Sequence, residues 1–255
     1  MTPKTGTGGS SSRLPGVRCT RPLTPLAPAP SVHTYFDTVP ESPDGRWLTW
    51  FEFTRDDLTA GNVVIASRDG QNPVRVASCE GNPHGGAKQG WLDAEHIYFS
   101  SGGRIHIADT KGEIVRVIEG AINVVHLGNR EGLGTSGGIR RFGGDSTKEA
   151  ACYRFNLDSG EKTKLFDRDA ALEVVRADPR PGCPEIPAEV IPQMAFKNTK
   201  WAPDGSCFAV VFSNEPHHKE SGFHFKRLMC AYRDGSGLRL VGPFGHHPNW
   251  LADGS

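Results

Sequence analysis

The sequence has no long apolar run, and none of its stretches approaches the roughly 18 consecutive apolar residues that a membrane-spanning helix needs. It has no excess of charge either: 29 lysines and arginines are balanced by 29 aspartates and glutamates, and no basic stretch is interleaved with aromatic residues. A nucleic-acid-binding surface would show such a basic patch. We therefore expect neither a membrane nor a nucleic acid among the partners of this protein.

Cysteine is also sparse. The six cysteines are widely separated in 255 residues and none belongs to a C-x-x-C pair, which argues against a zinc ribbon or a thioredoxin-like motif. A disulfide framework is typical of shorter chains that are denser in cysteine. We expect reduced thiols that are mostly buried, because a free cysteine packs like a small hydrophobic residue.

Residues 1–30 lack acidic side chains altogether and are rich in proline, glycine, serine and threonine. They contain no apolar core of about 7–15 residues, which a secretory signal requires. A segment of this composition buries too little apolar surface to fold. We predict a disordered leader over residues 1–30, a folded domain over residues 31–255 and, by default, a cytoplasmic location.

Glycine and proline, in contrast, are abundant, with 31 and 19 residues, and they recur in a Pro-Asp-Gly turn. The Asp-Gly pair supplies the positive φ angle that a tight hairpin needs. Copies of this turn lie at 42–45, 202–205 and 251–254, with a degenerate copy at 91–94. Three of the four copies begin with or directly follow a tryptophan, namely Trp91, Trp201 and Trp250. Each of the first three turns in the chain is followed by an apolar segment with strand character.

A second repeat consists of a strand, a turn and another strand. Its turns contain Asp69, Asp109, Asp158 and Asp234, which are 40, 49 and 76 residues apart, and a proline-rich insertion lengthens the last interval. Strand pairs that recur about every 40–50 residues are typical of propeller blades, each a four-stranded sheet. We predict an all-β protein, a β-propeller with four blades and the start of a fifth at Pro248.

The final Asp-Gly turn is followed only by Ser255. An open array of blades leaves strand edges unpaired. We therefore expect the sequence to be part of a longer propeller of about six to eight blades. A half-propeller that closes by dimerising is the alternative.

Ligands of propellers bind at the mouth of the central channel, where the segments before the innermost strands converge. These segments contain several polar side chains that bind metals or ligands, and two predictions follow from them. We predict that Mn²⁺ or Ca²⁺ is bound by His246, His247 and Gln193. We predict that a ligand is contacted by His33, His84, Gln89 and Lys200. The competing interpretation is that each histidine is a solvated loop residue or satisfies a backbone carbonyl.

Three pieces of the sequence resemble known propellers, namely 42–45, 213–216 leading to 226–228, and 245–250. The Trp-x-Pro-Asp-Gly strand starts resemble the propeller of the TolB translocation protein, and from His33 onward the chain is similar to the oligogalacturonate lyases. This resemblance implies seven blades, a Mn²⁺ held near the axis by histidines and a glutamine, and cleavage of short pectin fragments by β-elimination. In that reaction the metal and an arginine stabilise the charge that develops when a histidine removes the proton next to the uronate carboxylate.

The resemblance is incomplete at the positions that matter for catalysis. His247 matches a metal ligand, and Arg227 takes the place of the charge-stabilising arginine. The position of the family's catalytic base, a histidine, is occupied here by Asn198, whose side chain does not take up a proton at neutral pH. The family's His-Glu-Gly metal segment reads Asn214-Glu215-Pro216 here. These changes predict altered or absent lyase activity.

The resulting expectation is an axial site for an acidic oligosaccharide or another carboxylated small ligand, with β-elimination at a divalent metal in the catalytic version. A non-enzymatic scaffold that binds a protein partner, as implied by the resemblance to TolB, is the alternative. A third hypothesis is the propeller half of a hydrolase of the prolyl-oligopeptidase type.

Overall fold

The computed structural model describes residues 29–34, 38–137, 149–178, 184–215, 221–242, 248 and 250. Within these residues the chain is almost entirely β-structure, arranged as four sheets of four strands each. Residues 1–28 lie outside the described residues, so the disordered leader stays a prediction. The start of a fifth blade also lies almost wholly outside them.

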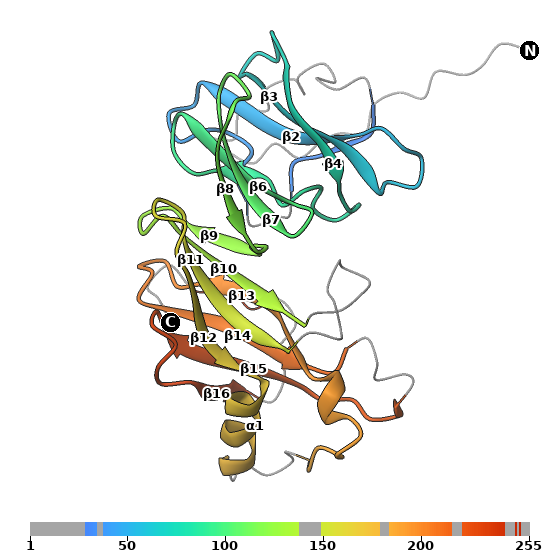
Figure 1. Ribbon diagram of the computed structural model, residues 1–255, viewed down its shortest axis with the longest axis vertical. Helices are drawn as coiled ribbons and strands as arrows, with labels where there is room; N and C mark the ends of the chain where they lie inside the picture. The colour runs from blue at the N-terminus through green and yellow to red at the C-terminus, as the bar shows by residue number, and fades with distance from the viewer. Residues whose placement is uncertain are drawn as a thin grey trace, which may run out of the picture.

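Each sheet is an antiparallel meander whose strands follow one another in chain order. The first contains β1 (Ser31–Val32), β2 (Trp47–Phe53), β3 (Ala60–Ser67) and β4 (Val74–Glu80). The second contains β5 (Gly90–Trp91), β6 (His96–Ser101), β7 (Arg104–Asp109) and β8 (Ile114–Glu119). The third contains β9 (Val124–His126), β10 (Glu131–Ser136), β11 (Ala151–Asn156) and β12 (Lys162–Asp167). The fourth contains β13 (Ala195–Trp201), β14 (Cys207–Ser213), β15 (Lys226–Tyr232) and β16 (Arg239–Gly242). The predicted all-β fold with four propeller blades is confirmed (Figure 1).

Aspartate side chains close several of the hairpin turns. Asp69 accepts hydrogen bonds from Ser67 Oγ at 2.6 Å and from the backbone N–H of Gln71 at 3.2 Å. Gly70, next in the turn, has a φ of 78°, which residues with a side chain rarely adopt. Asp234 likewise accepts two hydrogen bonds, both from Ser236: one from its backbone N–H at 2.9 Å and one from its hydroxyl at 2.6 Å. Because each turn is stabilised by residues within it, the strands on either side pair as hairpins.

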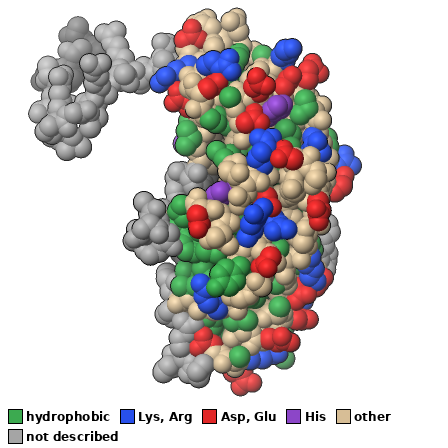
Figure 2. All heavy atoms as spheres, turned by 90° about the vertical axis from the view of Figure 1, so that its left-hand side faces the viewer, with side chains coloured by type: hydrophobic (Ala, Val, Ile, Leu, Met, Phe, Trp, Pro, Cys, Tyr) green, Lys and Arg blue, Asp and Glu red, His purple; other side chains and the backbone are tan. Residues whose placement is uncertain are grey.

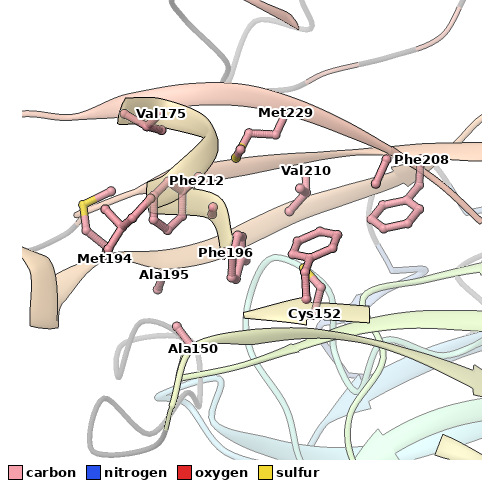
Figure 3. Packing of buried hydrophobic residues seen from close by; sticks show 14 of the residues in the cluster. Ala150, Cys152, Val175, Met194, Ala195, Phe196, Phe208, Val210, Phe212 and Met229 are labelled. Carbon is pink, nitrogen blue, oxygen red and sulfur yellow. The ribbon is translucent and has the colours of Figure 1, made fainter. Parts of the chain in front are cut away.

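Apolar clusters lie between successive sheets, because alternate residues of a strand point to opposite faces. Phe51 of the first sheet and Phe99 of the second share one cluster, and Ile105 of the second sheet and Phe155 of the third share another. A third cluster joins the third and fourth sheets. Figure 3 shows its residues on both sides, with Phe196, Val210 and Phe208 of the fourth sheet lying above Cys152 of the third. The sheets therefore stack face to face, as the blades of a propeller do.

Two tryptophans donate a hydrogen bond from the indole N–H to a backbone carbonyl of the preceding part of the chain. Trp91 Nε1 donates a hydrogen bond to the carbonyl of Pro40 at 2.9 Å, and Trp250 Nε1 donates one to the carbonyl of Lys200 at 3.2 Å. Pro40 and Lys200 each stand two residues before a Pro-Asp-Gly turn copy, so the two bonds are equivalent in the repeat. Trp201 differs, because its Nε1 is buried with no hydrogen-bond partner in the described part of the chain.

A helix that the sequence pattern did not predict lies in the insertion between the third and fourth sheets. α1 (Arg168–Ala177) begins after Asp167, whose carboxylate accepts a hydrogen bond from the backbone N–H of Ala170 at 3.1 Å. One face of the helix is buried in the cluster between these sheets through Ala171, Leu172 and Val175. The helix is only ten residues long, so its periodicity is not sustained along the sequence, which explains the omission. No helix in the described residues is long and apolar enough to cross a bilayer.

Candidate functional site

Gln89 is fully buried at the start of the second sheet, where its side chain makes two hydrogen bonds. Its Oε1 accepts from the backbone N–H of Ala87 at 3.1 Å, and its Nε2 donates to the carbonyl of Val32 at 3.2 Å. The Gln89 carbonyl accepts a further bond from Thr34 Oγ1 at 2.6 Å. Gln89 thus joins the second sheet to β1, and its predicted contact with a ligand stays a prediction that this geometry does not favour.

His33 and His84 are both exposed, the first directly after β1 and the second in the connection between β4 and β5. The backbone N–H of His84 donates to Asn82 Oδ1 at 3.0 Å, which holds the start of that connection in a turn. Their exposure agrees with the view that each is a solvated loop residue and also leaves them accessible to a ligand.

Gln193 ends the short helix η2 (Ile191–Gln193), which leads into β13. Its Oε1 is buried without a hydrogen-bond partner among the described residues, so this amide has a free acceptor that suits a cation or a donor group. The other two predicted metal ligands, His246 and His247, lie outside the described residues. Within the described ranges no three His, Cys, Asp or Glu side chains group as metal ligands. The metal site therefore stays a prediction.

Asn198 occupies an irregular position in β13. The register with β14 shifts between Lys197 and Lys200, and Asn198 has a φ of 52°. This left-handed conformation is uncommon for residues with a side chain, and asparagine is among those that adopt it most readily. This irregularity is a β-bulge, and it lies between the first residues of β13 and Lys200, which is near the end of the strand.

A lysine–glutamate cluster, formed by Lys197, Glu215, His224 and Lys226, lies at the other end of β13. Lys197 Nζ pairs with Glu215 Oε2, and Lys226 Nζ binds the same oxygen at 3.0 Å. His224 Nε2 lies 3.7 Å from Glu215 Oε1. Two ammonium groups therefore share one carboxylate.

Strand register explains why these residues meet. Residues directly opposite one another in antiparallel strands share a face of the sheet. Ala195 is opposite Ser213, and Ser213 is opposite Lys226. Lys197 follows Ala195 by two positions and so points to the same face. Ser213 Oγ, between the lysine-bearing strands, is buried without a hydrogen-bond partner in the described residues.

Burial weakens the preference of both lysines for the charged state. The Lys226 side chain is 5% exposed and that of Lys197 is 18% exposed, whereas His224 is 48% exposed. Loss of water, followed by repulsion from Lys226, lowers the pKa of Lys197 to about 8. Loss of water also lowers the pKa of Lys226. The cluster is therefore a partly enclosed cationic site whose open side is marked by His224.

Arg227 does not join this cluster. It is opposite Phe212 in the register of β14 and β15, which places it on the other face of the sheet from Lys226. Its guanidinium lies 4.7 Å from the centre of the Phe225 ring and donates a hydrogen bond to the carbonyl of Lys226 at 2.8 Å. The predicted role of Arg227 in stabilising charge stays a prediction, and the structure does not bring it together with the lysines.

The sequence-based search missed Lys197, His224 and Lys226. The sequence places Lys197 near the start of one strand and Lys226 at the start of another. Only the pairing of these strands with β14 shows that the two lysines lie on the same face of the sheet. The segment 134–138 also has the spelling of a G-x-S-x-G nucleophile elbow. Its serine, Ser136, lies in β10 and donates to the carbonyl of Glu149 at 2.7 Å, which is not the strand-to-helix turn of a hydrolase.

Charge is mixed on the surface as it is in the sequence. The face drawn in Figure 2 carries acidic and basic side chains interspersed, without a large area of one sign. The lysine–glutamate cluster differs from this surface because its two lysines are largely buried.

The stacked four-stranded meanders define the class of protein as a β-propeller. No family model matches the chain, and no curated protein matches it either. Among solved structures, the chain is similar to an oligogalacturonate lyase in complex with manganese, with a TM-score of 0.54 and 16% identity over 88% of this chain and 58% of the other. The chain thus spans a little over half the length of that lyase, and the likeness establishes the fold alone.

Two further structures are similar at lower scores. TolB from Acinetobacter baumannii has a TM-score of 0.42 and 15% identity, covering 82% of this chain and 45% of its own. The β-propeller domain of the trilobed protease from Pyrococcus furiosus has a TM-score of 0.41 and 12% identity, covering 78% of this chain and 54% of its own.

Proposed function

We propose that this propeller binds an acidic oligosaccharide, or another small carboxylated ligand, at the lysine–glutamate cluster. One observation carries the proposal: the ammonium groups of Lys197 and Lys226 share the single carboxylate of Glu215 while largely withdrawn from water. Two partly buried ammonium groups side by side attract anions. A ligand carboxylate would accept charge-assisted hydrogen bonds from them, and such bonds are stronger than those between neutral groups.

The position of the cluster in the blade supports the same ligand. Lys197 lies in β13, the first strand of its sheet, and the first strands of the blades surround the central channel of a propeller. Gln193 precedes this strand and has a buried carbonyl oxygen without a partner among the described residues. The hydroxyl groups of a saccharide are donors that such an oxygen accepts.

We propose binding rather than cleavage. β-Elimination needs a base and a group that stabilises the developing charge. The base position is occupied by Asn198, whose amide does not take up a proton at neutral pH, and Arg227 is on the opposite face from the lysines. A Mn²⁺ or Ca²⁺ held by Gln193, His246 and His247 would polarise the ligand carboxylate.

Calorimetric titration with trigalacturonate tests the proposal, with uncharged maltotriose as the control ligand. We expect only trigalacturonate to bind, and Lys197→Met or Lys226→Met to weaken its affinity about tenfold, as expected for the loss of one charge-assisted hydrogen bond. Lys111→Met, in the exposed turn between β7 and β8, should change the affinity by less than about twofold.

Each titration is repeated with added Mn²⁺ and with His247→Ala, and the metal content of both proteins is measured by mass spectrometry. Manganese that is lost in His247→Ala would support the predicted metal ligands. Equal binding of the two saccharides would contradict the proposal, and so would the absence of binding with or without Mn²⁺. A scaffold for a protein partner would then be the better account.

A further inference from the structure

The two lysines of the cluster are unusual because one carboxylate oxygen brings their ammonium groups together. Both Nζ atoms bind Glu215 Oε2. A second positive charge nearby disfavours protonation of an amine, and removal of water has the same effect. A lysine in such a place is a better nucleophile than one at the surface, because only the neutral amine has a free electron pair.

Lys197 is the more accessible of the two amines. Its side chain is 18% exposed, compared with 5% for Lys226. His224, which is half exposed, lies on the other oxygen of Glu215 and marks the open side of the cluster. Burial first and Lys226 second lower the pKa of Lys197 to about 8, against the opposing contact with Glu215, and this leaves more free amine at neutral pH than a surface lysine has. Lys197 is therefore the lysine of the pair whose side chain is more exposed to solvent.

We infer that Lys197 is a reactive amine that forms a Schiff base with an oxo acid, a small compound that carries both an aldehyde or ketone and a carboxylate. Lys197 first gives a proton to Glu215. The neutral Nζ then attacks the carbonyl carbon, and the carbinolamine loses its hydroxyl group as water, with Glu215 returning the proton. A C=N bond replaces the C=O bond, and no oxidant or reductant is needed. The ligand carboxylate pairs with the ammonium of Lys226.

Ser213 supports a polar occupant at this place. Its hydroxyl is buried on the same face as both lysines and has no partner among the described residues. A buried hydroxyl without a hydrogen bond is costly, and an oxygen of the bound oxo acid would satisfy it.

This inference goes beyond saccharide binding, although the two are compatible. A uronic acid at the reducing end of an oligosaccharide carries an aldehyde and a carboxylate in its open-chain form. The Schiff base does not require the saccharide, however, so it is tested with smaller compounds. If trigalacturonate binds but Lys197 forms no Schiff base, only this inference is contradicted. If Lys197 forms a Schiff base but trigalacturonate does not bind, only the proposed function is contradicted.

Reductive trapping provides the test. The wild-type protein is incubated with glyoxylate and a small amount of sodium cyanoborohydride, which reduces the C=N bond to a stable secondary amine, and modified lysines are located by peptide mass spectrometry. We expect Lys197 to be labelled at least about tenfold faster than the exposed Lys111 in the same sample, as a larger fraction of neutral amine implies. Glycolaldehyde, which lacks the carboxylate, should show a smaller preference for Lys197.

Two variants separate reactivity from mere accessibility. Lys226→Met removes the neighbouring charge and should slow labelling of Lys197 about tenfold, whereas Lys226→Arg keeps the charge and should preserve most of the rate. Labelling of Lys197 no faster than that of Lys111 in the wild-type protein would overturn the inference. Because that comparison uses one wild-type sample, it decides the question even where a variant fails to fold.

Discussion

Arg233 donates two hydrogen bonds, each of 2.8 Å, to the two carboxylate oxygens of Glu131. The pair joins the turn after β15 in the fourth sheet to β10 in the third, and the side chain of Glu131 is only 4% exposed. Arg154 Nε lies 3.6 Å from the same carboxylate. Three charged groups thus meet where the third and fourth sheets adjoin.

Arg233→Ala should therefore destabilise the protein by leaving a buried carboxylate poorly compensated. We expect a loss of about 2–3 kcal/mol in the free energy of unfolding, below the full cost of an unpaired buried charge because Arg154 remains nearby. Arg239→Ala, an exposed arginine in β16, is the matched control and should change stability by less than about 0.5 kcal/mol. Urea unfolding measures both, and equal losses in the two variants would contradict the bridging role.

The hydrogen bond of Trp91 predicts that Trp91→Phe and Trp201→Phe, although the same kind of substitution, change the free energy of unfolding by different amounts. Trp91→Phe removes the hydrogen bond to Pro40, whereas Trp201→Phe removes an indole N–H that has no partner in the described residues. Both side chains are buried to a similar degree. We expect Trp91→Phe to cost about 1 kcal/mol more than Trp201→Phe in urea unfolding, because its carbonyl partner also loses a donor. Equal costs would show that the link contributes nothing.

The left-handed backbone of Asn198 restricts what can replace it. Asn198→Val should lower the free energy of unfolding by about 1–2 kcal/mol, because a β-branched residue is strained at this φ angle. Asn198→Gly relieves that restriction and should cost less than Asn198→Val. Thermal unfolding of the two variants provides the comparison. A tolerated valine would mean that the bulge rearranges at little cost.

Removing Lys197 should change how stability depends on pH. Burial and Lys226 lower its pKa in the folded protein from 10.5 to about 8. Between these values the unfolded chain binds more protons than the folded protein does, so the free energy of unfolding rises with pH. We expect the wild type to gain stability relative to Lys197→Met between pH 8 and pH 10.5. Because Lys226 interacts with Lys197, the difference reports the titration of Lys197 together with its effect on Lys226. A flat or falling difference in urea unfolding would argue against the lowered pKa.

Local chemistry made the blades predictable. The turn at Asp69 needs only a serine hydroxyl, a backbone N–H and a glycine with positive φ, all within a few residues. Strand pairs that flank such turns recur along the chain, so their number and order follow from the amino-acid sequence without knowledge of distant contacts. α1 escaped prediction because it is a single helix of ten residues between two strand repeats, too short to give a sustained helical periodicity.

The candidate site depended on tertiary structure instead. Lys197 and Lys226 are separated by 28 residues, and they meet only because Ser213 is paired with both neighbouring strands. The same register turns Arg227 away from them, although it follows Lys226 directly. A shift of one residue in strand pairing would move every side chain to the opposite face. Residue types and repeats therefore determine the blades, whereas strand register and burial decide which charges meet.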